Sequence, residues 1–387
     1  MAEQAKVPEI RFAGFTDPWE QRKFGDCFEF LKSNTLSRAG LNGENGTARN
    51  VHYGDILIKF GDCLDGERSD LPFITDDTVL PKYAGSILRE GDVIFADTAE
   101  DETAGKCVEL RKLPKEPTIS GLHTIPARPR FPFGTGYLGH YLNSDAYHRQ
   151  LLPLMQGIKV ISISKAALQD TQVRFPGLSE QSAIGAALNE IDSLITLHQR
   201  KCDKLVIFKK SMLEKMFPKD GESVPEIRFA GFTDPWEQRK FSDIVDVCSG
   251  KDYKHLEEGP IPVYGTGGFM TSVDEALSYD RDAVGIGRKG TIDKPYLLKA
   301  PFWTVDTLFY AIPKSDMDLE FVHCSFLNVD WKSKDESTGL PSLSKEAINE
   351  TIALVPSFNE QSRLGDFFYN LDNLITLHQR KRLWFAK

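Results

Sequence analysis

The sequence predicts an α+β fold with two β-rich domains in tandem, each followed by a long helix, and with the two helices packing as an antiparallel coiled coil. The main observation is an internal repeat: residues 7–24 (VPEIRFAGFTDPWEQRKF) recur without a mismatch as residues 224–241. Residues 162–181 also align without gaps on residues 342–361. Because such a repeat marks a duplicated structural unit, the chain is expected to contain two units of the same fold.

The segments between these repeated ends show little identity, so one scaffold is expected to present two different recognition surfaces. Short β-like runs separated by Gly, Asp and Pro fill both segments. We expect strands at residues 53–60, 91–96 and 159–164, and in the second segment at residues 261–264, 283–287 and 304–312. Short helices are expected at residues 138–151 and 319–326.

After Pro176 the period of the apolar residues changes from two to about three and a half, which is typical of a coiled-coil seam. The repeated motif LITLHQRK, at residues 194–201 and 374–381, lies in both predicted helices. We expect the helix–helix and partner interface to consist of Ile184, Leu188, Ile191, Ile195, His198, Leu364, Phe368, Leu371, Ile375 and His378.

These patterns divide the chain into five parts. They are a first domain at residues 1–176, a first helix at 177–217, a linker at 218–223, a second domain at 224–357 and a second helix at 358–387.

Composition limits the possible classes of protein. A net charge of -9 argues against a nonspecific nucleic-acid binder, although a local basic face is enough to bind phosphate. The six cysteines lie far apart without a CxxC pair, so neither a disulfide framework nor a zinc site is expected. No apolar run approaches the roughly 18 residues of a membrane helix, and the N-terminus lacks the apolar stretch of a secretory signal. We therefore expect a cytoplasmic protein with no membrane partner.

Familiar catalytic motifs do not occur in the sequence. There is no Asn/Asp-Pro-Pro-Tyr/Phe tetrapeptide to hold a flipped base, no GxxxxGK phosphate loop, no HExxH and no GxSxG. Residues 133–136 resemble a loop that cradles S-adenosylmethionine, but without a preceding strand we interpret them as a turn. We therefore expect no catalytic residue, metal site or cofactor in this chain.

A glycine-bounded basic loop is the strongest candidate for a DNA contact. Residues 284–291 (VGIGRKGT) follow a β-like run and place two cations between glycines. Glycine permits close backbone approach, and the planar fork of arginine suits guanine O6 and N7 or a phosphate. The candidate residues are Gly287, Arg288, Lys289 and Thr291, with Thr266 in a neighbouring Gly-rich turn. The alternative is a solvated hairpin tip.

The corresponding loop of the first unit, residues 95–106, has different chemistry. Its acids can accept a hydrogen bond from cytosine N4, and Thr98 can bond to a base or touch a thymine methyl group. Lys106 is a further candidate in this loop. Arg128 and Arg130 are candidates for phosphate contacts. Because the two units would present different loops on the same scaffold, we expect them to recognise different halves of a DNA site.

The repeated motifs resemble those of the specificity subunit of type I restriction-modification systems. The resemblance rests on the PEIRFAGFTDPWEQRK opening of each half, on SLSKEAINE and VPSFNEQ before the second helix, and on LITLHQRK. It implies two target-recognition domains, each reading one half of a bipartite double-stranded DNA sequence, with helices that set the spacer. It further implies two modification subunits that bind S-adenosylmethionine and methylate adenine, and restriction subunits that use ATP and Mg²⁺.

Three other classes of protein remain open from the sequence. A stand-alone two-module DNA-binding regulator predicts tight specific binding without a partner. A scaffold predicts partner contacts that do not depend on DNA sequence. A self-sufficient methyltransferase is disfavoured because the base-holding tetrapeptide does not occur.

Overall fold

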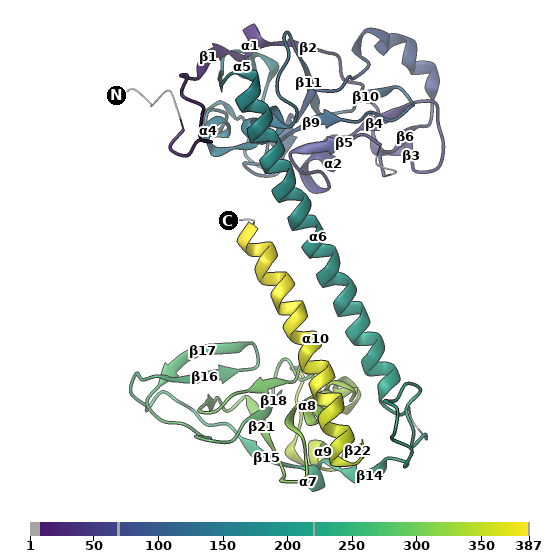
Figure 1. Cartoon of the computed structure of the whole chain (residues 1–387), viewed down its shortest axis with the longest axis vertical. Helices are drawn as coiled ribbons and strands as arrows, with labels where there is room; N and C mark the ends of the chain where they lie inside the picture. The colour runs from purple at the N-terminus through teal and green to yellow at the C-terminus, as the bar shows by residue number, and fades with distance from the viewer. Residues whose placement is uncertain (1–7, 68–69, 220, 386–387) are drawn as a thin grey trace. The chain divides into compact units, whose positions relative to one another are not determined.

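The computed structural model describes residues 8–67, 70–219 and 221–385 (Figure 1). The chain forms two compact units, Met1–Ile195 and Thr196–Lys387. The boundary lies inside the long helix α6 (Leu178–Met216), so this helix contributes to both units.

The first unit is built on a five-stranded sheet whose central strand, β7, is buried along its whole length. Only the pair β5–β9 is parallel; the other neighbours are antiparallel. The order of the strands is β2 (Phe28–Phe30), β11 (Thr124–Pro129), β7 (Val93–Ala96), β9 (Cys107–Arg111) and β5 (Cys63–Asp65).

Smaller sheets and short helices complete the first unit. A four-stranded sheet has the order β10 (Thr118–Ser120), β4 (Arg49–Val51), β6 (Phe73–Ile74) and β3 (Leu41–Asn42). Two pairs are β1 (Glu20–Lys23) with β13 (Gln172–Phe175), and β8 (Thr98–Ala99) with β12 (Ile161–Ser162). The helices before α6 are α1 (Phe24–Cys27), α2 (Tyr53–Ile58), α3 (Tyr137–Asn143), α4 (Asp145–His148) and α5 (Lys165–Gln169), with 3₁₀ turns at Arg38–Gly40, Asp77–Ser86 and Leu152–Leu154.

Three predicted elements of the first unit were wrong in type or extent. The strand expected at residues 159–164 is reduced to β12, which has two residues. Residues 53–60, expected as a strand, contain the helix α2, because the His52 ring accepts a hydrogen bond from the Gly54 N–H and caps its first turn. Asp55 and Ile56 are then the buried residues of this helix. Residues 138–151 form two helices instead of one, because Ser144 is extended between them.

The second unit contains a four-stranded sheet of order β15 (Val245–Ser249), β21 (Leu308–Pro313), β18 (Ala283–Gly287) and β19 (Tyr296–Leu298). A three-stranded sheet has the order β17 (Gly268–Val273), β16 (Ile261–Gly265) and β20 (Trp303–Thr304), and β14 (Glu237–Lys240) pairs with β22 (Ile352–Val355). The helices are α7 (Phe241–Ile244), α8 (Leu319–Leu327), α9 (Lys345–Asn349) and α10 (Phe358–Phe385), with a 3₁₀ turn at Trp331–Lys334. The single strand expected at residues 304–312 is split into β20 and β21 by a turn in which the Leu308 N–H donates to the Val305 carbonyl.

The repeat in the sequence is a repeat in the fold. The order β2–β11–β7–β9 in the first unit matches β15–β21–β18–β19 in the second. The pair β1–β13, with Glu20 opposite Phe175, matches the pair β14–β22, with Glu237 opposite Val355. The predicted tandem of α+β units is confirmed.

The predicted antiparallel packing of the long helices is confirmed within the second unit. Helix α6 has 39 residues and α10 has 28. His198 lies 2.8 Å from His378 between Nδ1 atoms, and Lys209 Nζ lies 2.7 Å from a carboxylate oxygen of Asp372. The residue numbers rise along one helix as they fall along the other, as antiparallel packing requires. None of the helices in the described part of the chain is long and apolar enough to cross a membrane.

Candidate nucleic-acid interface

The loop that follows β18, residues 287–291, is held on both sides by backbone hydrogen bonds; we call it the Arg288 loop. The N–H groups of Arg288 and Lys289 both donate to the Thr307 carbonyl, at 2.8 and 3.3 Å. The Arg288 carbonyl accepts from the Leu343 N–H at 3.0 Å, and the Gly290 N–H donates to the Pro341 carbonyl at 2.8 Å. Both cations therefore project from a backbone that is already fixed.

Gly287 is required by the close approach of the backbone in this loop. A Cβ atom at this position would lie 1.9 Å from the Thr291 carbonyl oxygen, a distance that no side chain tolerates. The Thr291 side chain is half-buried.

The side chains of Arg288 and Lys289 are exposed. One Arg288 Nη atom lies 3.4 Å from the Asp306 carbonyl, and the guanidinium carbon lies 5.7 Å from the centre of the Phe309 ring. These contacts orient the arginine stem, and the rest of the guanidinium fork faces solvent. A planar donor held in this way is suited to paired acceptors on a base edge or a phosphate.

A hollow of about 780 Å³ lies beside the Arg288 loop. Thr307, which holds the loop, also lines this hollow, together with Thr266 from the Gly-rich turn between β16 and β17. The structure thus brings Thr266 close to the segment that supports Arg288. The remaining lining includes Asp252, Tyr253, Lys254, Gly265, Gly267, Gly268, Phe269, Met270, Val305 and Asp306.

Phe269, Met270 and Lys254 are surface residues at this hollow that the sequence analysis missed. Phe269 is 64% exposed and Met270 is 52% exposed. The Phe269 ring rests edge-on against Tyr264, and the Tyr296 hydroxyl donates to the Gly265 carbonyl at 2.6 Å. The sequence signal that could have found Phe269 and Met270 is their position directly after the Gly267-Gly268 turn, because residues at a turn tend to face solvent.

In the first unit, Asp97 lies where Arg288 lies in the second. The Asp97 N–H donates to the His123 carbonyl at 3.1 Å, as Arg288 does to Thr307. The Asp97 carbonyl accepts from the Ile163 N–H at 2.8 Å, as Arg288 does from Leu343. The predicted correspondence of the two loops therefore extends to individual backbone hydrogen bonds.

The Asp97 surface is polar and includes two residues that the sequence analysis missed. The Thr98 hydroxyl donates to the Asp97 carboxylate at 2.7 Å, and His123 Nδ1 lies 3.3 Å from the same carboxylate. Tyr53 packs edge-on against the His123 ring at 5.4 Å between centres. His123 adopts a positive φ of 53°, which places an imidazole where most residue types are disfavoured.

Lys106 has a structural partner in the same unit. Its ammonium donates to the carbonyls of Leu57 and Phe60, at 3.2 and 3.0 Å, just where α2 ends. Burial lowers the pKa of Lys106. We therefore assign Lys106 to capping this helix and drop it from the DNA surface.

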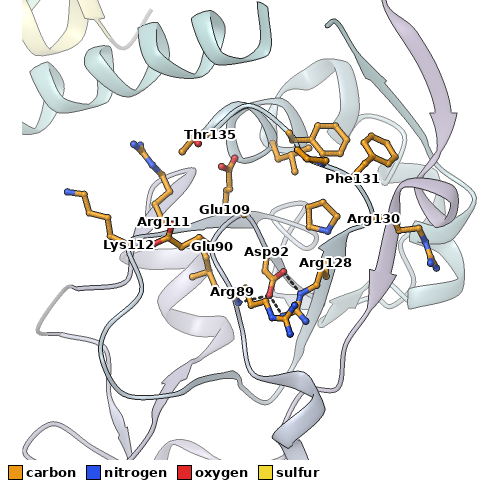
Figure 2. A pocket seen from close by; sticks show the side chains of 16 residues that line it. Arg89, Glu90, Asp92, Glu109, Arg111, Lys112, Arg128, Arg130, Phe131 and Thr135 are labelled. Carbon is orange, nitrogen blue, oxygen red and sulfur yellow. Dashed lines mark hydrogen bonds and ion pairs between the residues drawn. The ribbon is translucent and has the colours of Figure 1, made fainter. Parts of the chain in front are cut away.

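Arg128 and Arg130 lie at the other end of the main sheet from Thr98. The register pairs Ala96 with Thr124 and Val93 with Ala127, so Arg128 lies past the start of β7 while Thr98 lies past its end. Figure 2 shows both arginines around a hollow of about 570 Å³, with dashed lines joining Arg128 to Asp92.

The contacts of the two arginines differ. Arg128 Nε and Nη2 lie 2.9 and 2.7 Å from the carboxylate of Asp92, which is 1% exposed. Arg130 is exposed and donates from Nε to the Phe28 carbonyl at 3.2 Å. Since Arg128 neutralises a buried carboxylate, we assign it a structural role and drop it from the DNA surface.

The expected seam residues contact different neighbours in the two units. In the second unit, Leu364, Phe368 and Leu371 are buried in the main core, Ile375 is 9% exposed, and His378 contacts His198. In the first unit, Ile184 packs against the domain core, and the seam residues that follow it are half-buried: Leu188, Ile191 and Ile195. The described residues contain no group of three or more His, Cys, Asp or Glu side chains placed to hold a metal ion.

A family model agrees with this geometry. Residues 233–383 match the type I restriction modification DNA specificity domain. The second half of the chain is therefore similar to a type I specificity domain. The resemblance to type I specificity subunits that the repeated motifs indicated is thereby confirmed.

Two curated relatives from Methanocaldococcus jannaschii carry the same family description. The type I restriction enzyme MjaVIII specificity subunit is 23% identical over 59% of this chain, and the putative MjaX specificity subunit is 21% identical over 62%. The match spans only 61% and 54% of the length of these relatives.

Solved structures show the same fold. The S subunit of a type I restriction-modification system from M. genitalium matches with a TM-score of 0.66 at 15% identity, covering 99% of this chain and 96% of that one. A chain from a structural study of complex assembly in the type I system matches with a TM-score of 0.52 at 15% identity, covering 98% and 95%. Both units of the chain thus share the fold of these proteins.

Proposed function

We propose that this chain is the DNA-sequence specificity subunit of a type I restriction-modification complex. Each unit reads one half of a bipartite double-stranded target. The observation that carries the proposal is that one duplicated sheet presents, at the same strand end, Arg288 in one unit and Asp97 in the other. Two copies of one sheet that carry opposite charges at equivalent positions are suited to a DNA target whose two halves differ in sequence.

In the second unit, Arg288 is the proposed base contact. Its guanidinium fork matches the two acceptors, O6 and N7, that guanine presents in the major groove. Lys289, next to Arg288, and Lys254, which lines the hollow, are exposed cations suited to phosphate contacts. Gly287, Thr291 and Thr266 shape the surface around them. These three cations can meet phosphates locally despite the net charge of -9, and Asp252 and Asp306 lie among them at the hollow.

In the first unit, Asp97 and Thr98 are the proposed base contacts. A carboxylate accepts from cytosine N4, and a threonine bonds to a base or touches a thymine methyl group. His123 and Tyr53 border this site and add hydrogen-bonding and stacking surfaces. Arg130, at the far end of the sheet, remains available for a backbone contact. The two half-sites should therefore differ in sequence.

The long helices are the proposed spacer and the docking surface for two modification subunits. Exposed apolar residues on both helices support this role, including Ile207 at 69%, Leu374 at 45% and Leu377 at 44%. The modification subunits would bind S-adenosylmethionine, flip the adenine and methylate it, and restriction subunits would use ATP and Mg²⁺. This chain would choose the site without catalysing a step.

The proposal is tested by mapping methylated adenines genome-wide in a host that carries the matching modification subunit. We expect a bipartite motif that disappears when this gene is deleted. Arg288→Ala should alter one half of the motif only, and Asp97→Asn the other half only. If one variant changed both halves, independent recognition by the two units would be wrong.

The regulator and the scaffold, two of the three other classes, give different results in the same system. A stand-alone regulator would bind its target tightly without any modification subunit and would leave methylation unchanged on deletion. A scaffold would hold its partners equally well with any DNA sequence.

A further inference from the structure

Two neighbouring apolar residues at the tip of the β16–β17 hairpin, Phe269 and Met270, face solvent; we call them the hairpin pair. Phe269 is 64% exposed and Met270 is 52% exposed. A single exposed apolar residue is normal on a protein surface, but both members of this pair line one hollow, the one that Thr266 and Thr307 also line. The hairpin pair therefore gives this hollow an apolar side.

A β-bulge explains why both residues line the same hollow. Val263 pairs with Thr271 and Tyr264 pairs with Phe269, so Met270 is an extra residue in the ladder. In a regular strand, the side chains of two successive residues point to opposite faces of the sheet. The bulge interrupts this alternation at the hairpin pair.

Contacts beneath the hairpin pair hold it in place. The Phe269 ring packs edge-on against Tyr264 at 6.4 Å between ring centres, and Tyr264 lies 6.3 Å from Tyr296 by the same measure. The Tyr296 hydroxyl donates to the Gly265 carbonyl at 2.6 Å. The Met270 thioether lies over Gly265, because a Cβ atom at this glycine would be 2.6 Å from Met270 Sδ. The pair is thus presented from a fixed support, as specific recognition requires.

The same hollow is connected to Arg288. Asp306 and Thr307 belong to its lining, and Arg288 contacts both of them. Its N–H donates to the Thr307 carbonyl at 2.8 Å, and one Nη atom lies 3.4 Å from the Asp306 carbonyl. The hairpin pair and the support of Arg288 therefore border one hollow of the second unit.

The chemistry of DNA leaves one suitable partner for apolar side chains at this place. Among the groups that base pairs present in the major groove, the C5 methyl group of thymine is the apolar one, and the others donate or accept hydrogen bonds. A phosphate is less suited to the hollow, because its lining carries the carboxylates of Asp252 and Asp306 against the ammonium of Lys254. A base edge with a methyl group fits this lining better than the DNA backbone does.

We infer that Phe269 and Met270 bind the C5 methyl group of a thymine in the half-site that Arg288 reads. The inference rests on the proposed function and deepens it, since it names a second base that the second unit recognises. On binding, the methyl group, the Phe269 ring and the Met270 thioether all lose contact with water. This burial favours thymine over a base that has no methyl group at the same position.

The inference is tested with the assembled complex of this chain and its modification subunits, on duplexes that carry the mapped methylation motif. Each thymine of the motif is replaced in turn by uracil, which lacks the methyl group and keeps every hydrogen-bonding group. We expect one replacement to weaken binding of the wild type roughly threefold to tenfold, because a methyl group is no longer buried. The double variant Phe269→Ala, Met270→Ala should bind that uracil duplex and its thymine counterpart with equal affinity.

Tyr279→Ala is the matched control for the double variant. Tyr279 is also 64% exposed, but it is not among the residues that line the hollow. This control should prefer thymine over uracil as the wild type does. Since Phe269 and Met270 are exposed, the double variant should keep a melting temperature near that of the wild type.

Three results would overturn the inference and leave the proposed function intact. They are sequence-specific binding that no uracil replacement weakens, an equal effect of uracil on the wild type and the double variant, and a double variant that binds every duplex more weakly by the same factor. The last result would indicate a wedge between base steps or a phosphate contact. A double variant that no longer assembles with the modification subunits would place the pair in a protein interface and would equally refute the inference. The lack of any sequence-specific binding would refute the proposed function, and the inference with it.

Discussion

Asp97 and Arg288 occupy equivalent positions in the two sheets and carry opposite charges. Each donates its N–H to the residue before the neighbouring strand, His123 at 3.1 Å and Thr307 at 2.8 Å. Each accepts, through its carbonyl, from the residue that precedes an N-capping serine, Ile163 or Leu343. One backbone arrangement therefore presents an acceptor in one unit and a forked donor in the other.

Replacing Arg288 should change recognition at a single base pair. If its guanidinium contacts guanine O6 and N7, Arg288→Ala should cost about 1–3 kcal/mol at that position and relax the preference there. Arg288→Lys keeps the charge but lacks the fork, so it should retain affinity better than specificity. The measurement is binding of the assembled complex to duplexes with each base substituted. Equal weakening on all of these duplexes would instead indicate a phosphate contact.

Gly287→Ala should disrupt the Arg288 loop. The new Cβ atom would lie 1.9 Å from the Thr291 carbonyl, so the backbone must move, at a cost of about 1–3 kcal/mol. Gly267→Ala is the matched control, because nothing lies within 4 Å of a Cβ atom there. Gly287→Ala should lower the melting temperature and weaken target binding, and Gly267→Ala should leave both near the wild-type values. Equal behaviour of the two variants would contradict the close-contact argument.

The frame of the fold was predictable because identical sequence at residues 7–24 and 224–241 dictates identical local structure. The apolar period after Pro176 likewise predicted α6 to within a residue at each end. Helix α2 was missed because the short apolar run Ile56–Leu57–Ile58, after Gly and Asp, is typical of a strand, while the deciding contact is the cap from His52.

The site was predictable in outline and not in its individual contacts. Glycines around Arg288 indicated a tight basic loop, and the repeat indicated its counterpart near Thr98. Whether a cation faces solvent depends on tertiary partners that the local sequence does not encode. Lys106 caps a helix and Arg128 neutralises Asp92, so two of the predicted contacts have internal partners.

The ion pairs Arg11–Glu180 and Arg228–Glu360, one in each unit, should be important for stability. The side chains of Arg228 and Glu360 are 12% and 2% exposed, so Arg228→Leu would leave a buried carboxylate without its partner. Breaking such a pair typically costs about 3–5 kcal/mol. Arg11→Leu is the equivalent change in the first unit, where the exposures are 14% and 3%. Denaturation followed by hydrogen exchange should show each variant loosening its own unit, and the idea fails if neither does.

Alkaline pH should weaken the attachment of α6 to the first unit through His140. Burial alone would lower the pKa of His140, but hydrogen bonds and charge from Asp62 and Cys63 raise it to about 10. The imidazolium also lies 3.3 Å from Asn189 and 4.0 Å from Asp192 on α6. Since the pKa in the folded state exceeds the ordinary 6.5, this stabilisation is complete below pH 6.5 and is lost as pH rises toward about 10.

The measurement for His140 is amide exchange of residues 178–192 between pH 7 and 10, corrected for intrinsic rates. The wild type should lose protection as pH rises, and His140→Gln should start lower and change little. An identical pH profile in both proteins would exclude His140 as the cause.

Acid pH should loosen the contact between α6 and α10 in the second unit through His198 and His378. Their Nδ1 atoms lie 2.8 Å apart, so one ring must donate and the other must offer a lone pair, which a doubly protonated pair cannot do. Partial burial, the charge of His198 and the charges of Lys201 and Lys381 lower the pKa of His378. A histidine whose pKa is depressed in the folded state stabilises the fold above the ordinary 6.5, and this contribution is lost as pH falls below that value.

Amide exchange in residues 196–203 and 374–384 should therefore rise between pH 7.5 and 5.5, after correction for intrinsic rates. His378→Leu fills the same place with an apolar side chain and removes the titrating group, so it should flatten this dependence. A variant that loosens with acid as steeply as the wild type would rule out the histidine pair.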